Sequence, residues 1–242
     1  MKILKGIEII DLALFVDSTL IISDVHIGYE EALNKQGILV PRTQFGEIVK
    51  QTEKILEKLK NEKIKTIIIN GDLKHEFGTI SEEEWRNTLK FLDLLSKHCS
   101  EIILIKGNHD KILGPIAKKR NITVLEDYVI ESKHGKIMVL HGDKIPGKKE
   151  FGNVSAIIIG HEHPAVSLKD GPRIENYKCF LKGKFRGKTL IVQPSFNTMT
   201  EGTNMLRDEI LSPFLKQNLG SFEVFIVEDK VYNFGKLKTL NR

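Results

Sequence analysis

Five short apolar runs in this chain each end in Asp, His or Asn, often beside a glycine. One run, TIII, leads into Asn70-Gly71 and then Asp72; its β-branched residues predict a strand buried on both faces, and Asn-Gly predicts a turn. The other four lead into Asp24-Val25-His26, Gly107-Asn108-His109-Asp110, His141-Gly142-Asp143 and Gly160-His161-Glu162-His163. Because open α/β sheets carry their chemistry at the carboxyl ends of strands, we expect a functional site at that edge.

The order of the predicted elements indicates two packed sheets. Early strands alternate with helices, one over 45–59 with an apolar stripe and one opened by the capping box Ser81-Glu82-Glu83-Glu84. A short helix is predicted over 111–119, and later strands come as hairpins over 179–192 and 222–234. We therefore expect an α/β (α+β) fold in which two mixed sheets, one from each half of the chain, are flanked by helices. The whole of 1–242 is expected to form one domain without a separate capping domain.

The composition, 40% hydrophobic and 29% charged, is that of a globular protein and not of a disordered one. No apolar run approaches the ~18 residues of a membrane span, and early charges such as Lys2 and Glu8 interrupt any signal-peptide core. We therefore expect a cytoplasmic protein. Cys99 and Cys179 are too few for a disulfide framework or a thiolate metal site, so we expect reduced structural thiols.

The net charge of +5 comes from one segment. Residues 144–188 hold ten Lys and Arg against four Asp and Glu, and the rest of the chain is about neutral. A local basic surplus fits an anionic partner, of which nucleic acid is the obvious one. It equally fits a solvated lysine-rich surface of the kind that heat-adapted proteins carry. The sequence leaves both interpretations open.

The polar residues at the five strand ends are of the types that bind metal ions. They are Asp24, His26, Asp72, Asn108, His109, His141, His161 and His163. Imidazole, carboxylate and amide without thiolate suit Mn, Fe, Zn or Ni, and more than four candidates suggest two ions. Two ions sharing a carboxylate would lower the pKa of a bound water and neutralise phosphoryl oxygens. The spacings Asp24-x-His26 and His161-x-His163 predict extended segments whose alternate side chains face the same way.

These motifs resemble the ordered signature of the calcineurin-like metallophosphoesterase superfamily, which is D-x-H, G-D, G-N-H-D/E, a His, then G-H-x-H. The resemblance spans residues 24–163 with every motif present. It implies Asp24, His26 and His163 as ligands of one metal ion, Asn108, His141 and His161 as ligands of a second, and Asp72 as the bridge. It also implies two mixed sheets flanked by helices as the fold, and two divalent ions, with Mn²⁺ the first expectation.

The same resemblance gives His109 a catalytic role without a metal: it would stabilise the phosphoryl oxygens or protonate the leaving oxygen. Asp110 would orient His109. The start Asp24-Val25-His26-Ile27-Gly28-Tyr29-Glu30 is similar to compact phosphoesterases related to SbcD-type double-strand-break repair nucleases and to DNA-ligase-associated relatives. From the size of the chain we expect neither the DNA-capping domain nor the coiled-coil segments of those repair nucleases.

Several residues outside the ligand set have two interpretations each. His75 and Arg42 are candidates for substrate binding, against a loop hydrogen bond for His75. Glu30 is more simply structural, and Trp85 falls on the buried stripe of its helix. His98 and His134, outside every motif, are expected at the surface, and Asp143 is a candidate support for His141. The 195–234 region has no evident catalytic task, which leaves a homodimer open.

Three functions remain in competition. The first is a dinuclear-metal phosphodiesterase acting on DNA or nucleotides, favoured by the complete ligand set and the basic segment. The second is a phosphatase or a phosphodiesterase for small cyclic or dinucleotide substrates, favoured by the absent capping domain. The third is a non-catalytic scaffold on the same fold, which the intact ligand set disfavours.

Overall fold

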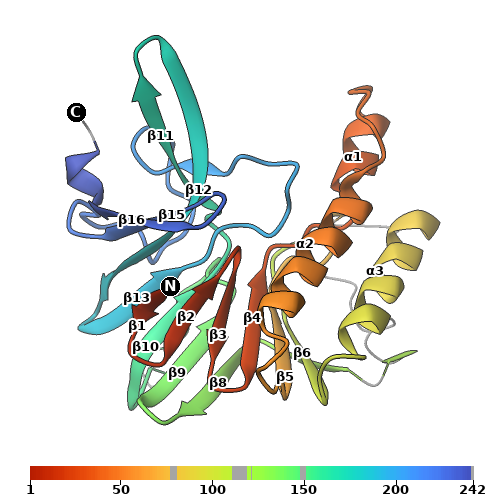
Figure 1. Ribbon diagram of the computed structural model, residues 1–242, viewed down its shortest axis with the longest axis horizontal. Helices are drawn as coiled ribbons and strands as arrows, with labels where there is room; N and C mark the ends of the chain where they lie inside the picture. Colours follow the sequence, from red (N-terminus) through yellow and green to blue (C-terminus); the bar gives the residue numbers. More distant parts are fainter. Residues whose placement is uncertain (77–80, 111–118, 121, 148–150, 241–242) are drawn as a thin grey trace.

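The computed structural model describes residues 1–76, 81–110, 119–120, 122–147 and 151–240 (Figure 1). The first of its two sheets has seven strands that follow one another in chain order. They are β1 (Lys2–Leu4), β2 (Ile7–Ile10), β3 (Ala13–Val16), β4 (Thr19–Ser23), β5 (Thr66–Asn70), β6 (Glu101–Ile105) and β7 (Thr123–Leu125). β1 to β4 pair antiparallel and β4 to β7 pair parallel, so this sheet is mixed.

The second sheet has nine strands. They are β8 (Asp127–Ser132), β9 (Gly135–Leu140), β10 (Val154–Ile159), β11 (Pro164–Asp170), β12 (Arg173–Phe185), β13 (Lys188–Val192), β14 (Thr203–Asn204), β15 (Glu223–Val227) and β16 (Val231–Lys236). Their order is β14-β11-β12-β13-β10-β9-β8, and β15 pairs with both β12 and β16. β9, β10 and β13 run parallel while β12 and β8 run antiparallel to their neighbours. The prediction of two mixed sheets, one from each half, is confirmed.

Two long helices connect the parallel strands of the first sheet. The described helices are α1 (Tyr29–Lys35), α2 (Gln44–Lys58), α3 (Glu82–Leu95) and the 3-10 helix η1 (Leu237–Thr239). α2 joins β4 to β5 and α3 joins β5 to β6, and both lie against this part of the sheet (Figure 1). Parallel strands require such crossovers, and the buried stripe of α2 matches the one predicted over 45–59. The helix predicted over 111–119 lies almost wholly outside the described residues.

Alternate residues of the second sheet face two different cores. Ile137, Val139 and Ile158 pack with the apolar residues of the first sheet, and Met138 and Ile157 pack on the opposite face. This period of two is what a strand buried on both faces requires.

Irregular chain covers the outer face of the second sheet, where the sequence had indicated a flanking layer of helix. Phe214, Leu215 and Phe222, from the segment after β14, pack on that face, and Leu237 of η1 joins them. Within the described ranges the helical layer therefore lies on the first sheet. The segment 205–222 forms turns and irregular chain, and its apolar residues do not follow the spacing of a helix face.

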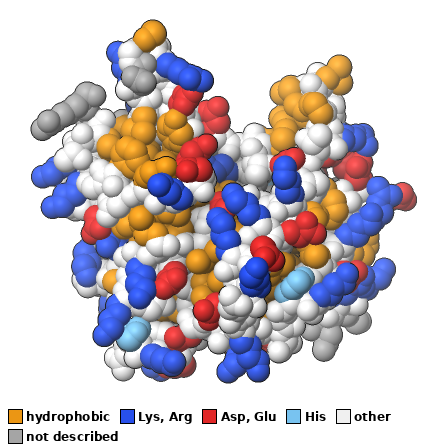
Figure 2. All heavy atoms as spheres, viewed as in Figure 1, with side chains coloured by type: hydrophobic (Ala, Val, Ile, Leu, Met, Phe, Trp, Pro, Cys, Tyr) orange, Lys and Arg blue, Asp and Glu red, His pale blue; other side chains and the backbone are white. Residues whose placement is uncertain are grey.

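Two projections rise from the same end of the molecule (Figure 1). One is α1 with the loop after it, and the other is the β11–β12 hairpin, of which the sequence had indicated only the part after Cys179. Hydrophobic side chains gather at the tips (Figure 2), where Ile38, Leu39 and Ile174 are all more than half exposed. No described helix is long and apolar enough to cross a membrane.

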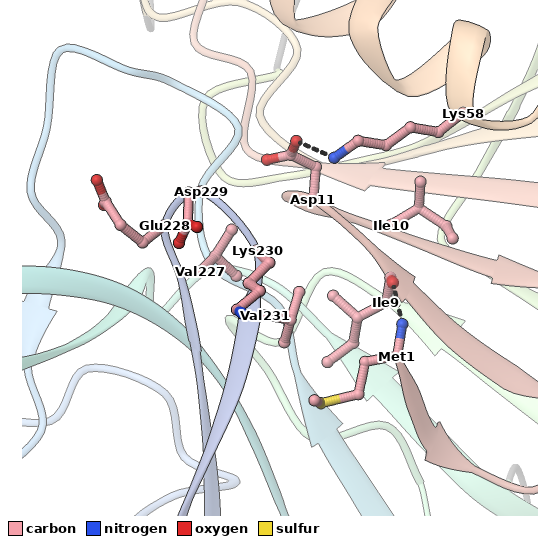
Figure 3. Close-up of a pocket in the computed structure, with 10 residues that line it drawn as sticks. All are labelled: Met1, Ile9, Ile10, Asp11, Lys58, Val227, Glu228, Asp229, Lys230 and Val231. Carbon is pink, nitrogen blue, oxygen red and sulfur yellow. Dashed lines mark hydrogen bonds and ion pairs between the residues drawn. The ribbon is translucent and has the colours of Figure 1, made fainter.

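Asp11 fastens the first sheet to α2 at the edge of a hollow of about 420 Å³ (Figure 3). Its Oδ2 accepts hydrogen bonds from Nζ of Lys54 and Lys58 at 2.9 Å each, and its Oδ1 accepts one from Gln51 at 2.9 Å. Burial raises the pKa of Asp11, but these three donors outweigh it and hold the pKa below its ordinary value. None of the candidate ligands lines this hollow, so it is a structural feature of the sheet edge.

Asp11→Asn should lower the free energy of unfolding at pH 7 by about 1 kcal/mol, because the lysines are half exposed and solvent screens them. A carboxylate whose pKa is lower in the folded state than in the unfolded state stabilises the fold at pH values above its unfolded-state pKa. That stabilisation is lost as the pH falls through the folded-state pKa. The difference from wild type in urea titrations should therefore shrink as the pH falls through the lowered folded-state pKa of Asp11. Asp17→Asn is the matched control, since Asp17 is exposed and, like Asp11, has a positive φ that Asn tolerates. Equal losses for both variants would contradict this role.

Candidate metal centre

The five motifs come together at one edge shared by the two sheets. Each follows the carboxyl end of a strand that has parallel neighbours: β4, β5 and β6 in the first sheet, β9 and β10 in the second. Parallel strands end at the same edge, so loops from both sheets meet there. Hydrogen bonds tie these loops together, including Asp24 N–H to the Gly71 carbonyl at 3.2 Å and Gly160 N–H to the His141 carbonyl at 2.8 Å.

Asp24, His26 and His163 form the first group of candidate ligands. Their ligand atoms lie within 4.8 Å of one another. His163 Nε2 is 3.4 Å from Asp24 Oδ1 and 3.3 Å from His26 Nε2. Asp24 is fully buried and His26 is 5% exposed, so the group has little contact with solvent except through His163.

Asp72, His141 and His161 form the second group, again with ligand atoms within 4.8 Å. His141 Nε2 lies 3.2 Å from His161 Nδ1 and 3.0 Å from Asn108 Oδ1, so the fourth expected residue is also present. One oxygen of Asp72, Oδ2, lies 3.4 Å from His141 Nε2 and 3.7 Å from His26 Nε2. This carboxylate therefore faces both groups, as a bridging ligand would.

These residues fit divalent metal ions. In each ligand group, one imidazole nitrogen faces another at hydrogen-bonding distance. When both rings of such a pair are neutral, only one of the two facing nitrogens can donate a hydrogen bond to the other. Asp24 Oδ1 is buried and has no hydrogen-bond partner within the described part of the chain. An orphaned carboxylate oxygen among converging imidazoles is costly unless a cation completes the site.

Charge among the ligands follows from their burial and proximity. Burial raises the pKa of Asp24, but His163 and His141 outweigh it and hold the pKa below its ordinary value. Burial lowers the pKa of His141, but the carboxylates of Asp72 and Asp24 outweigh it and raise the pKa to about 9. The two carboxylates are thus anionic at neutral pH and attract any nearby cation.

The ligand loops adopt left-handed backbone, which corrects the predicted extended segments. Asp24, His26, Asp72, His161 and His163 have φ between 45° and 65°. L-residues seldom adopt this conformation, and each instance costs roughly 1–3 kcal/mol when the surroundings enforce it. The side chains in D-x-H and G-H-x-H therefore converge through sharp local turns rather than through the alternation of a strand.

Two glycines allow the loops to approach each other. A Cβ on Gly160 would lie 2.0 Å from Ser23 Oγ and 2.4 Å from Asp24 Oδ2. A Cβ on Gly107 would lie 2.0 Å from Asp72 Oδ1. The glycines of the G-H-x-H and G-N-H-D motifs are thus required by contact with the carboxylates of other motifs.

A buried amide network supports the D-x-H loop, and it was not apparent in the sequence. Gln44 Nε2 donates to the His26 carbonyl at 2.8 Å and to Asn197 Oδ1 at 3.0 Å. Asn197 N–H donates to the Asp24 carbonyl at 3.2 Å, and Glu30 Oε2 accepts from Gln44 N–H at 2.8 Å. Glu30 is therefore structural, as the simpler interpretation held. Lone Gln and Asn residues 153 positions apart give no signal in a single sequence.

Two lysines, the half-buried Lys178 and the buried Lys74, bind backbone of the same layer. Lys178 Nζ donates to the carbonyls of Ser195 and Asn197, and burial lowers the pKa of Lys178 to about 7. Lys74 is fully buried and donates to the carbonyls of Glu76 and, at 2.6 Å, His109. Both lysines bind backbone oxygens of loops that carry site residues or their supporting residues, so their hydrogen bonds order backbone close to the ligands.

His109 lies beside the two groups with its ring fixed. Its Nδ1 lies 2.5 Å from the His75 carbonyl oxygen; a carbonyl only accepts, so Nδ1 carries the hydrogen. Its Nε2 faces Asp72 Oδ2 at 4.0 Å. The Asp110 carboxylate accepts instead from backbone N–H of Gly107 at 3.1 Å and Leu73 at 3.3 Å. The His75 carbonyl, and not the Asp110 carboxylate, therefore orients the His109 ring. Asp110 instead links the loop that carries Gly107 to the loop that carries Leu73.

His75 packs against the site and Arg42 does not. The His75 ring stacks on His109 with centroids 5.1 Å apart and lies edge-on to Tyr29 at 4.6 Å. Burial and the neighbouring His109 lower the pKa of His75 to about 4, so it is neutral at pH 7. Arg42 is exposed and pairs with Glu83 at 2.7 Å, apart from both ligand groups.

Glu84 departs from the expected capping box. Ser81 Oγ accepts from Glu84 N–H at 3.1 Å, which is half of that motif. The Glu84 carboxylate accepts instead from N–H of His75 at 2.9 Å and Glu76 at 3.0 Å, so the start of α3 holds the loop that carries His75. Trp85 is half-buried against the core, and His98 and His134 are exposed, as expected.

The basic segment is dispersed rather than gathered beside the ligands. Lys184, Arg186 and Lys188 surround the β12–β13 turn, at the start of β13 and therefore at the end opposite the site. Lys182 pairs with Glu223 at 2.9 Å and Arg173 pairs with Glu175 at 2.7 Å. Among the described residues of 144–188, the surplus forms no single phosphate-binding surface.

Comparison with known proteins gives the same fold. The model of the family described as calcineurin-like phosphoesterase matches residues 18–152. A nuclease MPE from Pseudomonas putida superposes with a TM-score of 0.64 at 18% identity over 93% of each chain. A protein of unknown function, AQ665 from Aquifex aeolicus, gives 0.40 at 23% identity over 60% of this chain and 78% of that one. The E. coli phosphoesterase Yfce gives 0.41 at 12% identity over 90% and 97%. None of the curated proteins matches.

Gly160→Ala should weaken Mn²⁺ binding by about 10–100-fold, because the added Cβ displaces the Asp24 carboxylate and its Ser23 partner. Isothermal titration calorimetry would measure the affinity. Gly46→Ala is the matched control: nothing lies within 4 Å of its added Cβ and it lies in α2, so it should bind metal as wild type does. Unchanged affinity in Gly160→Ala would show that Asp24 is not a ligand.

Proposed function

Because the chain belongs to the calcineurin-like phosphoesterase family and is a metal-dependent hydrolase, we propose that it cleaves phosphodiester bonds in nucleic acid or nucleotides with two divalent ions. The observation that carries this proposal is Asp72 Oδ2, which faces His26 of one ligand group and His141 of the other. Asp24, His26 and His163 would hold one ion, and Asn108, His141 and His161 the other. When bound, the ions would supply Lewis acidity toward water and the phosphoryl oxygens.

The remaining chemistry falls to His109. Its Nδ1–H is held by the His75 carbonyl, so a second proton taken up by the ring would sit on Nε2, the nitrogen that faces the ligands. From there it can pass to the leaving oxygen of a phosphoester as the P–O bond breaks. The neutral His75 ring stacked on His109 restricts its rotation without adding a competing charge.

A small phosphodiester as substrate is the second candidate, and the dispersed basic segment favours it. A long strand needs several cations along its path, whereas Lys184, Arg186 and Lys188 lie at the far end of β13. The nuclease from P. putida shares the fold, and at 18% identity that likeness does not decide the substrate. A scaffold without catalysis is disfavoured by the intact ligand groups. For the metal we propose Mn²⁺, which suits imidazole with carboxylate.

Asp72→Asn should abolish Mn²⁺-dependent hydrolysis of bis(4-nitrophenyl) phosphate, with a loss on the order of 100-fold or more, since it removes the charge that faces both groups. Initial rates of nitrophenolate release measure this. His134→Ala, at an exposed histidine, is the control. Retained activity in Asp72→Asn would refute the dinuclear proposal.

His109→Ala should bind Mn²⁺ as wild type does but lose roughly 100-fold or more in kcat on diesters with alkoxide leaving groups. The loss should be smaller for a nitrophenolate, which leaves without protonation. Calorimetry and parallel assays on a dinucleotide and an aryl diester separate the two effects. Loss of metal in this variant would make His109 a ligand instead.

End-labelled single- and double-stranded DNA, cyclic nucleotides and an aryl diester, assayed side by side with Mn²⁺, distinguish the substrates. If DNA is the substrate, its cleavage should fall steeply with salt, as multiple phosphate contacts require. Given the dispersed lysines, we expect weak salt dependence and faster turnover of small diesters. Rapid, strongly salt-sensitive DNA cleavage would reverse this order.

A further inference from the structure

A hollow of about 270 Å³ adjoins the second ligand group at the junction of the two sheets. Its wall includes His141, so an occupant lies directly beside a candidate ligand. It is formed by the end of β6, the β7–β8 junction, and the chain after β9. Sites at such junctions are where ligands bind in layered folds.

The hollow combines an apolar floor with charged groups at its rim. Leu140, Ile145 and Pro146 supply the apolar surface. Lys106 and Lys144 lie at the rim, and each Nζ is 2.9 Å from a different oxygen of Glu126. The volume is just below the range of about 300–1,000 Å³ that holds drug-sized ligands, so it suits a smaller group that has a flat apolar face.

The lysines can release Glu126 for another anion. Their side chains are 50% and 69% exposed, and exposed ion pairs contribute only about 0–1 kcal/mol. Two cations share one carboxylate, so one positive charge is left unbalanced. A phosphate bound there can pair with that charge. Asp143, also on the wall, can accept a hydrogen bond from an N–H group of a base, as carboxylates do in nucleic-acid recognition.

We propose that this hollow binds the nucleoside on one side of the scissile phosphate, with its base on Ile145 and Pro146 and an adjoining phosphate on Lys106 and Lys144. The inference rests on the proposed function and gives it a preference: diesters that carry a nucleoside should be better substrates than diesters without one. It requires no long strand, so it holds for nucleotides and for polynucleotide ends alike.

Two substrates with the same leaving group test the preference. Thymidine 3′-phosphate 5′-(4-nitrophenyl phosphate), whose 3′-phosphate is the adjoining phosphate, and bis(4-nitrophenyl) phosphate are compared with Mn²⁺ in wild type, in Ile145→Trp, which fills the hollow, and in the double variant Lys106→Ala/Lys144→Ala. Both variants should lower the ratio of kcat/KM for the nucleoside diester over the aryl diester about tenfold. Ile174→Trp, at the exposed tip of the β11–β12 hairpin, should leave both activities unchanged.

Binding of thymidine 3′,5′-bisphosphate, measured by calorimetry on the protein without added metal, gives a second readout. Affinity should fall several-fold in both variants and not in Ile174→Trp. An unchanged ratio, an equal loss on both substrates or unchanged nucleotide affinity would overturn the inference while leaving the phosphodiesterase intact. If wild type cleaves neither diester, the proposed function fails, and the binding measurement alone then decides whether the hollow takes a nucleotide.

Discussion

The buried carboxylates of Asp24 and Asp72 are the constraint on which the rest of the structure depends. Both lie out of contact with solvent and remain anionic, and a buried charge is tolerated only where partners surround it. The partners here are imidazoles from loops of both sheets. The two sheets must therefore end at one common edge, and the parallel strands β4, β5, β6, β9 and β10 are the arrangement that achieves this.

Bringing five loops to one point forces backbone strain, and the surrounding contacts offset it. The five ligands in left-handed conformation all lie within loops whose carbonyls or amides are bound from outside: His26 by Gln44, Asp24 by Asn197 and Ser195. Each such bond is worth about 1 kcal/mol in the interior, so several are needed for each strained residue. These bonds account for the buried polar side chains beside the ligand loops, among them Gln44, Asn197 and Lys74.

The convergence of the candidate ligands was predictable from the sequence because each motif is local, joining a strand end to a polar residue within a few positions. The supporting layer could not be predicted, because its contacts join residues that lie far apart in the sequence. The hydrogen bond from Lys178 to the Ser195 carbonyl, for example, ends on the backbone, and no pattern of residue types indicates it. The orienting role expected of Asp110 went to the His75 carbonyl for the same reason. The β11 strand was missed because much of the hairpin it forms is exposed, and its residues lack apolar alternation.

Charge placement, rather than total charge, determines what the site can hold. The excess of +5 suggests a polyanion, yet the lysines around the β12–β13 turn lie at the end of the sheet away from the ligands. Among the described residues, Lys74 and Lys178 lie near the ligands but are committed to backbone carbonyls. In the described part of the chain, Lys106 and Lys144 on Glu126 line the same hollow as His141, and this pair is enough to neutralise one further phosphate. The charges near the ligands thus match a substrate with one or two phosphates better than an extended strand. Salt largely screens exposed cations that lie more than a Debye length from the substrate, so the distant lysines contribute little to its binding.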